Sequence, residues 1–319
     1  MAEGLPPFDP QWLAAEQMMG GRVVIEADSI EKTREKFVGI FAGLAPFIPP
    51  PTDAVRSEDV QLTPTQRVRI YTPAGETKPL PVGLYIHSGG WFTGSVEGED
   101  HLCRTIAEKS RVILFSPDYR LAPENPYPAG LNDVCAAYEF MNAKAAEYGG
   151  DQKRKLVMGG SAGGNLAACV ALKYSSNEEL KPTGLVSACM ASCDPLALPS
   201  DYKSRYTPER YSDAPMIGNS IMQQAREWLK VPQPEDPLYS PLLHPDIKLL
   251  PKTYIAACTK DPTHQESVFF SEECQKQGVD TDLVEWVGWP HFFWVIPVLP
   301  KSAEFLDVWC KKLKAMAGS

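Results

Sequence analysis

The segment KLVMGGSAGGN, residues 155–165, contains the pattern Gly-x-Ser-x-Gly around Ser161. The apolar run before the serine predicts a buried strand, and the apolar run at 166–172 predicts a helix. A serine on such a sharp strand-to-helix turn has a strained backbone and lifts its hydroxyl above the sheet. Glycines at Gly159 and Gly163 let the strand and the helix pass close together. The segment therefore predicts a nucleophilic serine at a nucleophile elbow.

Apolar runs and helical periodicity alternate along the rest of the chain. Alternating strands and helices indicate an α/β protein with a mostly parallel, doubly wound sheet, in which ligands bind at the carboxyl ends of the strands. We expect strands at 60–72, 80–88, 112–116, 156–158, 185–190, 254–258 and 281–287. We expect helices at 12–19, 29–44, 102–109, 131–148, 217–229, 267–277 and 302–315.

The composition is that of a soluble globular protein with a large core. The chain has 319 residues, 44% of them hydrophobic, and a formal net charge of -9, which argues against nucleic acid or an anionic membrane as a partner. No apolar run approaches the ~20 residues that span a bilayer, so we expect no membrane insertion. The N-terminus lacks a basic segment followed by an apolar one, so no signal peptide is expected.

Eight cysteines are spread over the chain, several of them inside apolar runs, as at Cys169 and Cys258. None forms a Cys-x-x-Cys pair, and no histidine cluster lies beside them. This pattern favours buried free thiols in a reducing compartment over disulfides or a metal site. We therefore expect a cytoplasmic protein with no metal ligands.

A serine hydroxyl needs a base to accept its proton and a third group to orient that base. Among the five histidines, His291 follows the last expected strand, and Asp261 follows the strand at 254–258. Both therefore lie on loops at carboxyl ends of strands, in the chain order Ser, Asp, His. His264 and Asp282 are the alternatives, although Asp282 lies within a strand and no acid follows His264 in an obvious loop.

The negatively charged intermediate of acyl transfer needs backbone N–H donors. The segment IHSGGW, residues 86–91, supplies a glycine turn directly after a strand. We assign the donors to Gly89, Gly90 and the N–H of Ala162. An ordinary glycine loop is the alternative interpretation of the turn.

These motifs resemble the hormone-sensitive-lipase-like branch of the α/β hydrolases. The glycine turn is similar to that branch's His-Gly-Gly-Gly motif, and DYRLAPENPYPA, residues 118–129, resembles its most distinctive stretch. Similarity extends over roughly residues 55–312. The resemblance implies one α/β-hydrolase domain over 1–319 with helical cap segments at about 1–50 and 195–240. It also implies hydrolysis of carboxylic esters without a metal or cofactor.

Several residues depart from the family's pattern. Ser88 replaces the first glycine of the turn, so either its hydroxyl contacts the substrate or only its backbone matters. Gly160 and Gln265 stand where the family has acids, and Phe292 stands where glycine is common. These departures suggest a reshaped pocket, to which we assign, as residues that contact the substrate, Ser88, Trp91, Tyr206, Met216 and Phe292.

The sequence thus predicts a serine carboxylesterase that hydrolyses small to medium esters, among them a lactone or an acetyl ester of a secondary metabolite. Fungal enzymes that deacetylate aromatic polyketides belong near this branch, and certain plant relatives use the fold for dehydration or cyclisation. A non-hydrolytic cyclase, lyase or acyltransferase is therefore the first alternative. A non-catalytic receptor is disfavoured by the full set of Ser161, Asp261 and His291. The partner is a small-molecule ester, and the sequence leaves a homodimer open.

Overall fold

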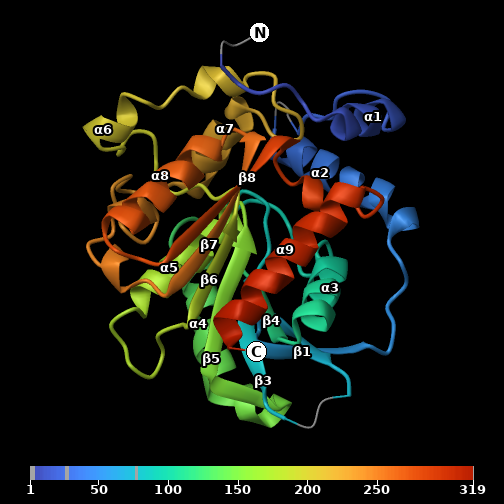
Figure 1. Ribbon diagram of the computed structural model, residues 1–319, viewed down its shortest axis with the longest axis vertical. Coiled ribbons are helices and arrows are strands. Elements are labelled where there is room, and N and C mark those ends of the chain that lie inside the picture. Colours follow the sequence, from blue (N-terminus) through green and yellow to red (C-terminus); the bar gives the residue numbers. More distant parts are fainter. Residues whose placement is uncertain (1–3, 26–28, 76–77, 319) are drawn as a thin grey trace.

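The computed structural model describes residues 4–25, 29–75 and 78–318, and within them it forms one eight-stranded sheet flanked by helices (Figure 1). Its strand order is β1-β2-β4-β3-β5-β6-β7-β8. Strand β2 is antiparallel to β1 and to β4, and the remaining pairs are parallel. The strands are β1 Val55–Thr63, β2 Gln66–Pro73, β3 Leu80–Ile86, β4 Ile113–Asp118, β5 Gly150–Gly160, β6 Gly184–Ala188, β7 Lys252–Lys260 and β8 Thr281–Pro290. The expected mostly parallel, doubly wound sheet is confirmed.

Helices cover both faces of the sheet. Helices α3 and α9 pack on one face, and α4, α5 and α8 pack on the other (Figure 1). Helices α1, α2, α6 and α7 lie beyond the carboxyl ends of the parallel strands. The helices are α1 Pro10–Met18, α2 Ile30–Leu44, α3 Asp100–Ser110, α4 Ala129–Lys144, α5 Ala162–Lys173, α6 Ser200–Lys203, α7 Asn219–Leu229, α8 His264–Lys276 and α9 Pro300–Ala317.

The core has two parts because successive side chains of a strand point to opposite faces of the sheet. In β3, Leu84 and Ile86 belong to one buried apolar cluster, and Tyr85 between them belongs to the other. Every residue of β3 is buried. A strand that is covered on both faces reads as a continuous apolar run, which is why the sequence revealed it.

The single strand expected at 60–72 is wrong. The structure has a hairpin there, in which β1 and β2 pair in antiparallel fashion around Pro64 and Thr65. Proline lacks an N–H and fixes its own φ, which favours a turn. Apolar residues alternate on both sides of the turn, so the alternation alone concealed the break.

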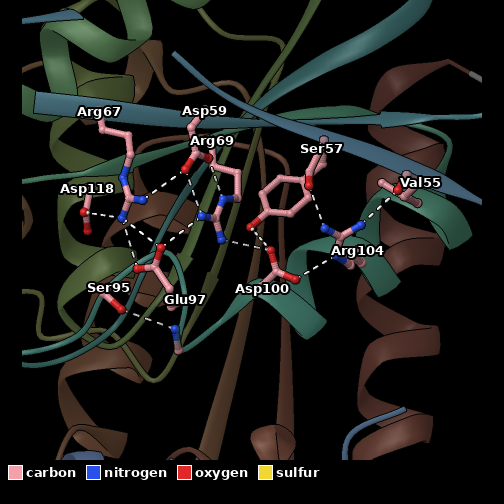
Figure 2. Close-up of polar contacts among 12 residues, drawn as sticks. Val55, Ser57, Asp59, Arg67, Arg69, Ser95, Glu97, Asp100, Arg104 and Asp118 are labelled. Carbon is pink, nitrogen blue, oxygen red and sulfur yellow. Dashed lines mark hydrogen bonds and ion pairs between the residues drawn. The ribbon is translucent and has the colours of Figure 1, made fainter. Parts of the chain in front are cut away.

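Paired charges join the two strands of this hairpin to each other and to the body of the protein (Figure 2). Arg69 on β2 donates to Asp59 on β1, with 2.6 Å between Nε and Oδ1. Arg67 donates to Asp118 at the end of β4, with 2.8 Å between Nη2 and Oδ2. Both arginines also reach Glu97 in the loop before α3. Charged side chains on an outermost strand also oppose pairing with other chains.

Among the described residues, none of the helices combines the length and the apolar character that crossing a membrane requires.

Candidate active site

Ser161 occupies the turn between β5 and α5, with φ 55° and ψ -125°. A positive φ is strained for a residue with a side chain. The N–H of Ser161 donates to the carbonyl oxygen of Ala188 at the end of β6, at 2.7 Å. This bond ties the turn to the neighbouring strand and helps to keep Ser161 in its strained conformation.

The glycines on either side of Ser161 are required by contact with neighbouring backbone. A Cβ atom on Gly163 would lie 2.1 Å from the carbonyl oxygen of Ile86. A Cβ atom on Gly159 would lie 2.5 Å from the carbonyl carbon of Gly163. Since backbone cannot move aside cheaply, only glycine fits at either position.

His291 and Asp261 form a buried pair at the ends of β8 and β7. The Nδ1 atom of His291 lies 2.8 Å from Oδ2 of Asp261, and their side chains are 4% and 0% exposed. The N–H of Thr263 donates to Oδ1 of Asp261, also at 2.8 Å. The carboxylate thus accepts two hydrogen bonds, one at each oxygen.

Each member of this pair favours the charged form of the other. Burial lowers the pKa of His291, but the adjacent Asp261 carboxylate outweighs burial and raises that pKa above its ordinary value. Burial raises the pKa of Asp261, but the charge of His291 and hydrogen bonds, including that from Thr263, bring it below its usual range. The pair is therefore suited to stabilise an imidazolium.

The two alternative residues have other partners. Nε2 of His264 lies 2.6 Å from Oε1 of Glu285, and its Nδ1 lies 3.0 Å from the hydroxyl of Tyr211. Asp282 pairs with Lys312. His264 and Asp282 therefore serve packing contacts at β8, α8 and α9 and not the pocket at Ser161.

Ser161 and His291 line the same narrow pocket, about 40 Å³ in volume. Its walls are largely apolar and come from α2, the glycine turn, α7 and the loop after β8. Side chains far apart in the sequence thus close around the serine. The lining residues are Ile25, Phe37, Ser88, Gly89, Gly90, Phe92, Thr93, Ser161, Met216, Ile217, Ile221, Met222, Ala225, His291 and Phe292.

Two residues of the glycine turn lie at this pocket. Gly89 and Gly90 have φ of 121° and 59°, and both line the pocket. Within the described chain, neither N–H donates to a protein acceptor. Ala162 begins α5, so its N–H also lacks a partner within the helix. Among the described residues, the N–H groups of Gly89, Gly90 and Ala162 thus have no protein acceptor.

Three of the five residues predicted to contact the substrate line this pocket, namely Ser88, Met216 and Phe292. Trp91 is buried and packs against Tyr239, with ring centroids 6.0 Å apart. Tyr206 lines a second cavity of about 520 Å³, which lies along another face of α7. Met222 of α7 borders both cavities.

Cys189, which follows β6, lies beside the pair of His291 and Asp261, although it was not among the residues predicted from the sequence. Its sulfur, a ring nitrogen of His291 and a carboxylate oxygen of Asp261 all lie within 4.8 Å of one another. These three residues are the one candidate metal-ligand group among the described residues. His291 and Asp261 are already hydrogen-bonded to each other, so the arrangement fits a thiol that packs against an ion pair better than it fits a metal site. No sequence pattern marks Cys189.

The pocket residues on α7 were also missed, although a signal existed. Ile221, Met222 and Ala225 recur at the spacing of one helical face within the helix expected at 217–229. Each is buried and faces the pocket.

Comparison with known proteins agrees with this geometry. A family model described as the alpha/beta hydrolase fold matches residues 83–295. The versiconal hemiacetal acetate esterase of Dothistroma septosporum is 32% identical over 309 residues, which cover 94% of this chain and 92% of that protein. Carboxylesterase NlhH of Mycobacterium tuberculosis is 32% identical over 68% of this chain and 67% of its own.

Solved structures give the same result. The structure of vibralactone cyclase superposes with a TM-score of 0.91 at 28% identity, covering 100% of this chain and 97% of that one. The hyperthermophilic esterase from Pyrobaculum calidifontis gives a TM-score of 0.85 at 28% identity, covering 98% and 100%. This chain therefore belongs to the α/β-hydrolase family and, within it, to the hormone-sensitive-lipase-like branch of carboxylic-ester hydrolases.

Proposed function

We propose that the protein hydrolyses esters through an acyl-enzyme formed on Ser161. His291 accepts the proton of the serine hydroxyl as Oγ attacks the ester carbonyl, and returns it to the departing alcohol. Water then attacks the acyl-enzyme and gives a proton to His291, which returns it to Oγ of Ser161 as the acyl–serine bond breaks and the acid leaves. Asp261 holds His291 in the tautomer that keeps Nε2 free. The observation that carries this proposal is that Ser161 and the Asp261-bound His291 line one pocket.

The tetrahedral intermediates place negative charge on the former carbonyl oxygen. We assign its stabilisation to the N–H groups of Gly89, Gly90 and Ala162. Donors fixed by the backbone do not have to reorganise during the reaction, and each contributes about 10²–10³ in rate in comparable sites.

The substrate in this proposal is a small ester, such as an acetyl ester of a secondary metabolite. The narrow pocket at Ser161 suits a short acyl group. The similar esterase of Dothistroma septosporum acts, by its name, on an acetate. Segments 1–50 and 195–240 act as a two-part cap, since Phe37 of the first and Ile221 and Met222 of the second contribute walls of the pocket.

Hydrolysis of p-nitrophenyl esters from acetate to palmitate, with S161A beside the wild type, tests the proposal. We expect serine-dependent turnover that is greatest for short chains. Retention of most of the turnover by correctly folded S161A would refute the assignment of Ser161. The matched control is Ser116→Ala, because that serine is buried in β4 away from the pocket.

A second candidate function is intramolecular acyl transfer. It is favoured by the similarity to vibralactone cyclase over the whole of this chain. In this reaction a hydroxyl of the acyl group replaces water as the nucleophile, giving His291 its proton, and the product is a lactone. Incubation of hydroxy-acyl esters in H₂¹⁸O separates the two reactions. Hydrolysis incorporates one ¹⁸O into a free acid, whereas cyclisation gives an unlabelled lactone.

We place the protein in the cytoplasm. All eight cysteines are free and buried, as is usual in reducing compartments. Fractionation of cells with antibodies against the protein tests this location. Light scattering of the purified protein tells a monomer from a homodimer.

A further inference from the structure

A buried carboxyl group lies directly behind the glycine turn. Glu99, the residue before α3, is 3% exposed. Its Oε1 accepts the backbone N–H of Ser88 at 2.8 Å, and its Oε2 lies 2.5 Å from the hydroxyl of Tyr85 on β3. Within the described residues, no lysine, arginine or histidine forms an ion pair with Glu99. An acid buried without a counter-charge is unusual, and its contacts point to a specific task.

Glu99 holds the first residue of the turn that carries the candidate oxyanion donors. Ser88 immediately precedes Gly89 and Gly90, so its position sets where their N–H groups point. The later part of the turn is held by backbone, since the N–H of Thr93 donates to the carbonyl oxygen of Gly89 at 2.9 Å. The Ser88 N–H instead depends on one side chain, that of Glu99.

The charge state of Glu99 matters because the oxyanion forms close by. A carboxylate bound to the N–H of Ser88 would repel negative charge that develops beside Gly89 and Gly90, most strongly in a low-dielectric interior. Burial raises the pKa of Glu99, although hydrogen bonds from Tyr85 and Ser88 oppose the shift. The other ionisable groups that face it are Cys103 on α3 and Tyr119 after β4, and neither supplies a positive charge. These surroundings favour the uncharged acid.

We propose that Glu99 is a positioning residue, an uncharged hydrogen-bond partner that fixes Ser88 and thereby aims the N–H groups of Gly89 and Gly90 at the oxyanion. The inference rests on the proposed function, since it takes those two groups as the oxyanion donors. The acid accepts from Ser88 at Oε1. The hydroxyl of Tyr85 donates to Oε2 of a carboxylate, but when Glu99 is uncharged this hydroxyl instead accepts the proton carried by Oε2. Glutamine reproduces this pattern without a charge, because its amide oxygen accepts from Ser88 and its NH₂ donates to Tyr85.

The test compares kcat and KM of E99Q and E99L with the wild type on p-nitrophenyl acetate. We expect E99Q to keep kcat within about threefold. E99L leaves the Ser88 N–H without an acceptor, so its kcat falls by about 10- to 100-fold while KM stays within about threefold, the pattern of a lost transition-state interaction. The control is E97Q, because Glu97 lies two residues away in the surface ion network and has no contact with Ser88.

Two results would overturn the proposal. One is E99L activity equal to that of the wild type, and the other is E99Q as impaired as E99L, which would mean that the charge is needed. If E99L does not fold, as judged by circular dichroism, E99M replaces it, because methionine keeps the length of the side chain. S161A in the same assay distinguishes a failure of the Glu99 proposal from a failure of the proposed function, because S161A tests the role of the serine alone.

Discussion

The buried Oδ2 of Asp261 accepts a hydrogen bond from Nδ1 of His291, with 2.8 Å between the two atoms. In the neutral imidazole ring this contact fixes the tautomer, so that Nε2 carries the lone pair. The two residues come from loops at the ends of β7 and β8, which are adjacent parallel strands. The pair is therefore positioned by the sheet itself.

Replacement of Asp261 by asparagine should lower kcat by about 10⁴, because the amide favours the wrong tautomer of His291 and supplies no charge. Steady-state kinetics on p-nitrophenyl acetate measure the loss. Asp282→Asn is the control, since Asp282 pairs with Lys312 away from the pocket, and its kcat should stay within about twofold. A kcat of D261N close to the wild-type value would contradict the role assigned to Asp261.

The same pair predicts how stability depends on pH. The pKa of His291 is raised by Asp261, so its contribution is complete below pH 6.5, the ordinary value, and declines as pH rises through the raised pKa. The pKa of Asp261 is lowered, so its contribution is present above pH 3.8 and is lost as pH falls through the lowered pKa. The gap in melting temperature between the wild type and D261N should be largest between pH 4 and 6.5. A gap that widens above pH 7 would be the opposite of this expectation.

The close packing at the elbow predicts that Gly163→Ala prevents folding or costs more than about 4 kcal/mol of stability, since its Cβ would lie 2.1 Å from the carbonyl oxygen of Ile86. Gly43→Ala in α2 is the matched control. A Cβ at Gly43 meets nothing within 4 Å, so alanine there should stabilise the helix by about 0.5–1 kcal/mol. Urea unfolding of both variants gives the two values. Equal changes in the free energy of unfolding would show that the close approach of Gly163 to the Ile86 carbonyl does not exclude a side chain.

A buried ion pair beside the second cavity predicts a large effect from one substitution. Arg226 and Glu266 are 14% and 1% exposed, and their side chains are 2.7 Å apart. Glu266→Leu leaves the guanidinium buried without its partner, which should cost about 3–5 kcal/mol. The exposed pair of Arg205 and Glu272 is the comparison, and Arg205→Ala should cost less than about 1 kcal/mol. If chemical denaturation shows a larger loss of stability for Arg205→Ala than for Glu266→Leu, the larger contribution expected of the buried pair is refuted.

Much of the site was predictable because its signals are local. The elbow needs a strand, a serine between glycines and a helix in succession, and all of these are encoded within 155–172. Likewise, Asp261 and His291 each follow an apolar run that forms a strand, so the sequence alone placed them at its carboxyl end.

The remaining features depend on which strands become neighbours. Strand β6 lies between β5 and β7, and this order brings Cys189 beside Asp261 and His291. Nothing near Cys189 in the sequence encodes that order. The packing of α7 against the body likewise decides that Met222 faces the pocket at Ser161, whereas Tyr206 faces the second cavity. Glu99 was missed because an acid at the start of a helix is ordinary, and only its burial sets it apart.

The arginine network around β1 and β2 implies that the outer strand β1 can open on its own. Only Val55 of β1 is buried, and Asp59 of β1 pairs with Arg67 and Arg69 through partly exposed charges, which salt screens. Strand β2, by contrast, buries Val68, Ile70 and Tyr71 in an apolar interior that salt reinforces. In concentrated salt, amide hydrogen exchange should therefore quicken first in residues 55–63 while β2 and β5 stay protected. Strand β1 would then behave as a separate cooperative unit, which opens while the site around Ser161 at the end of β5 stays folded.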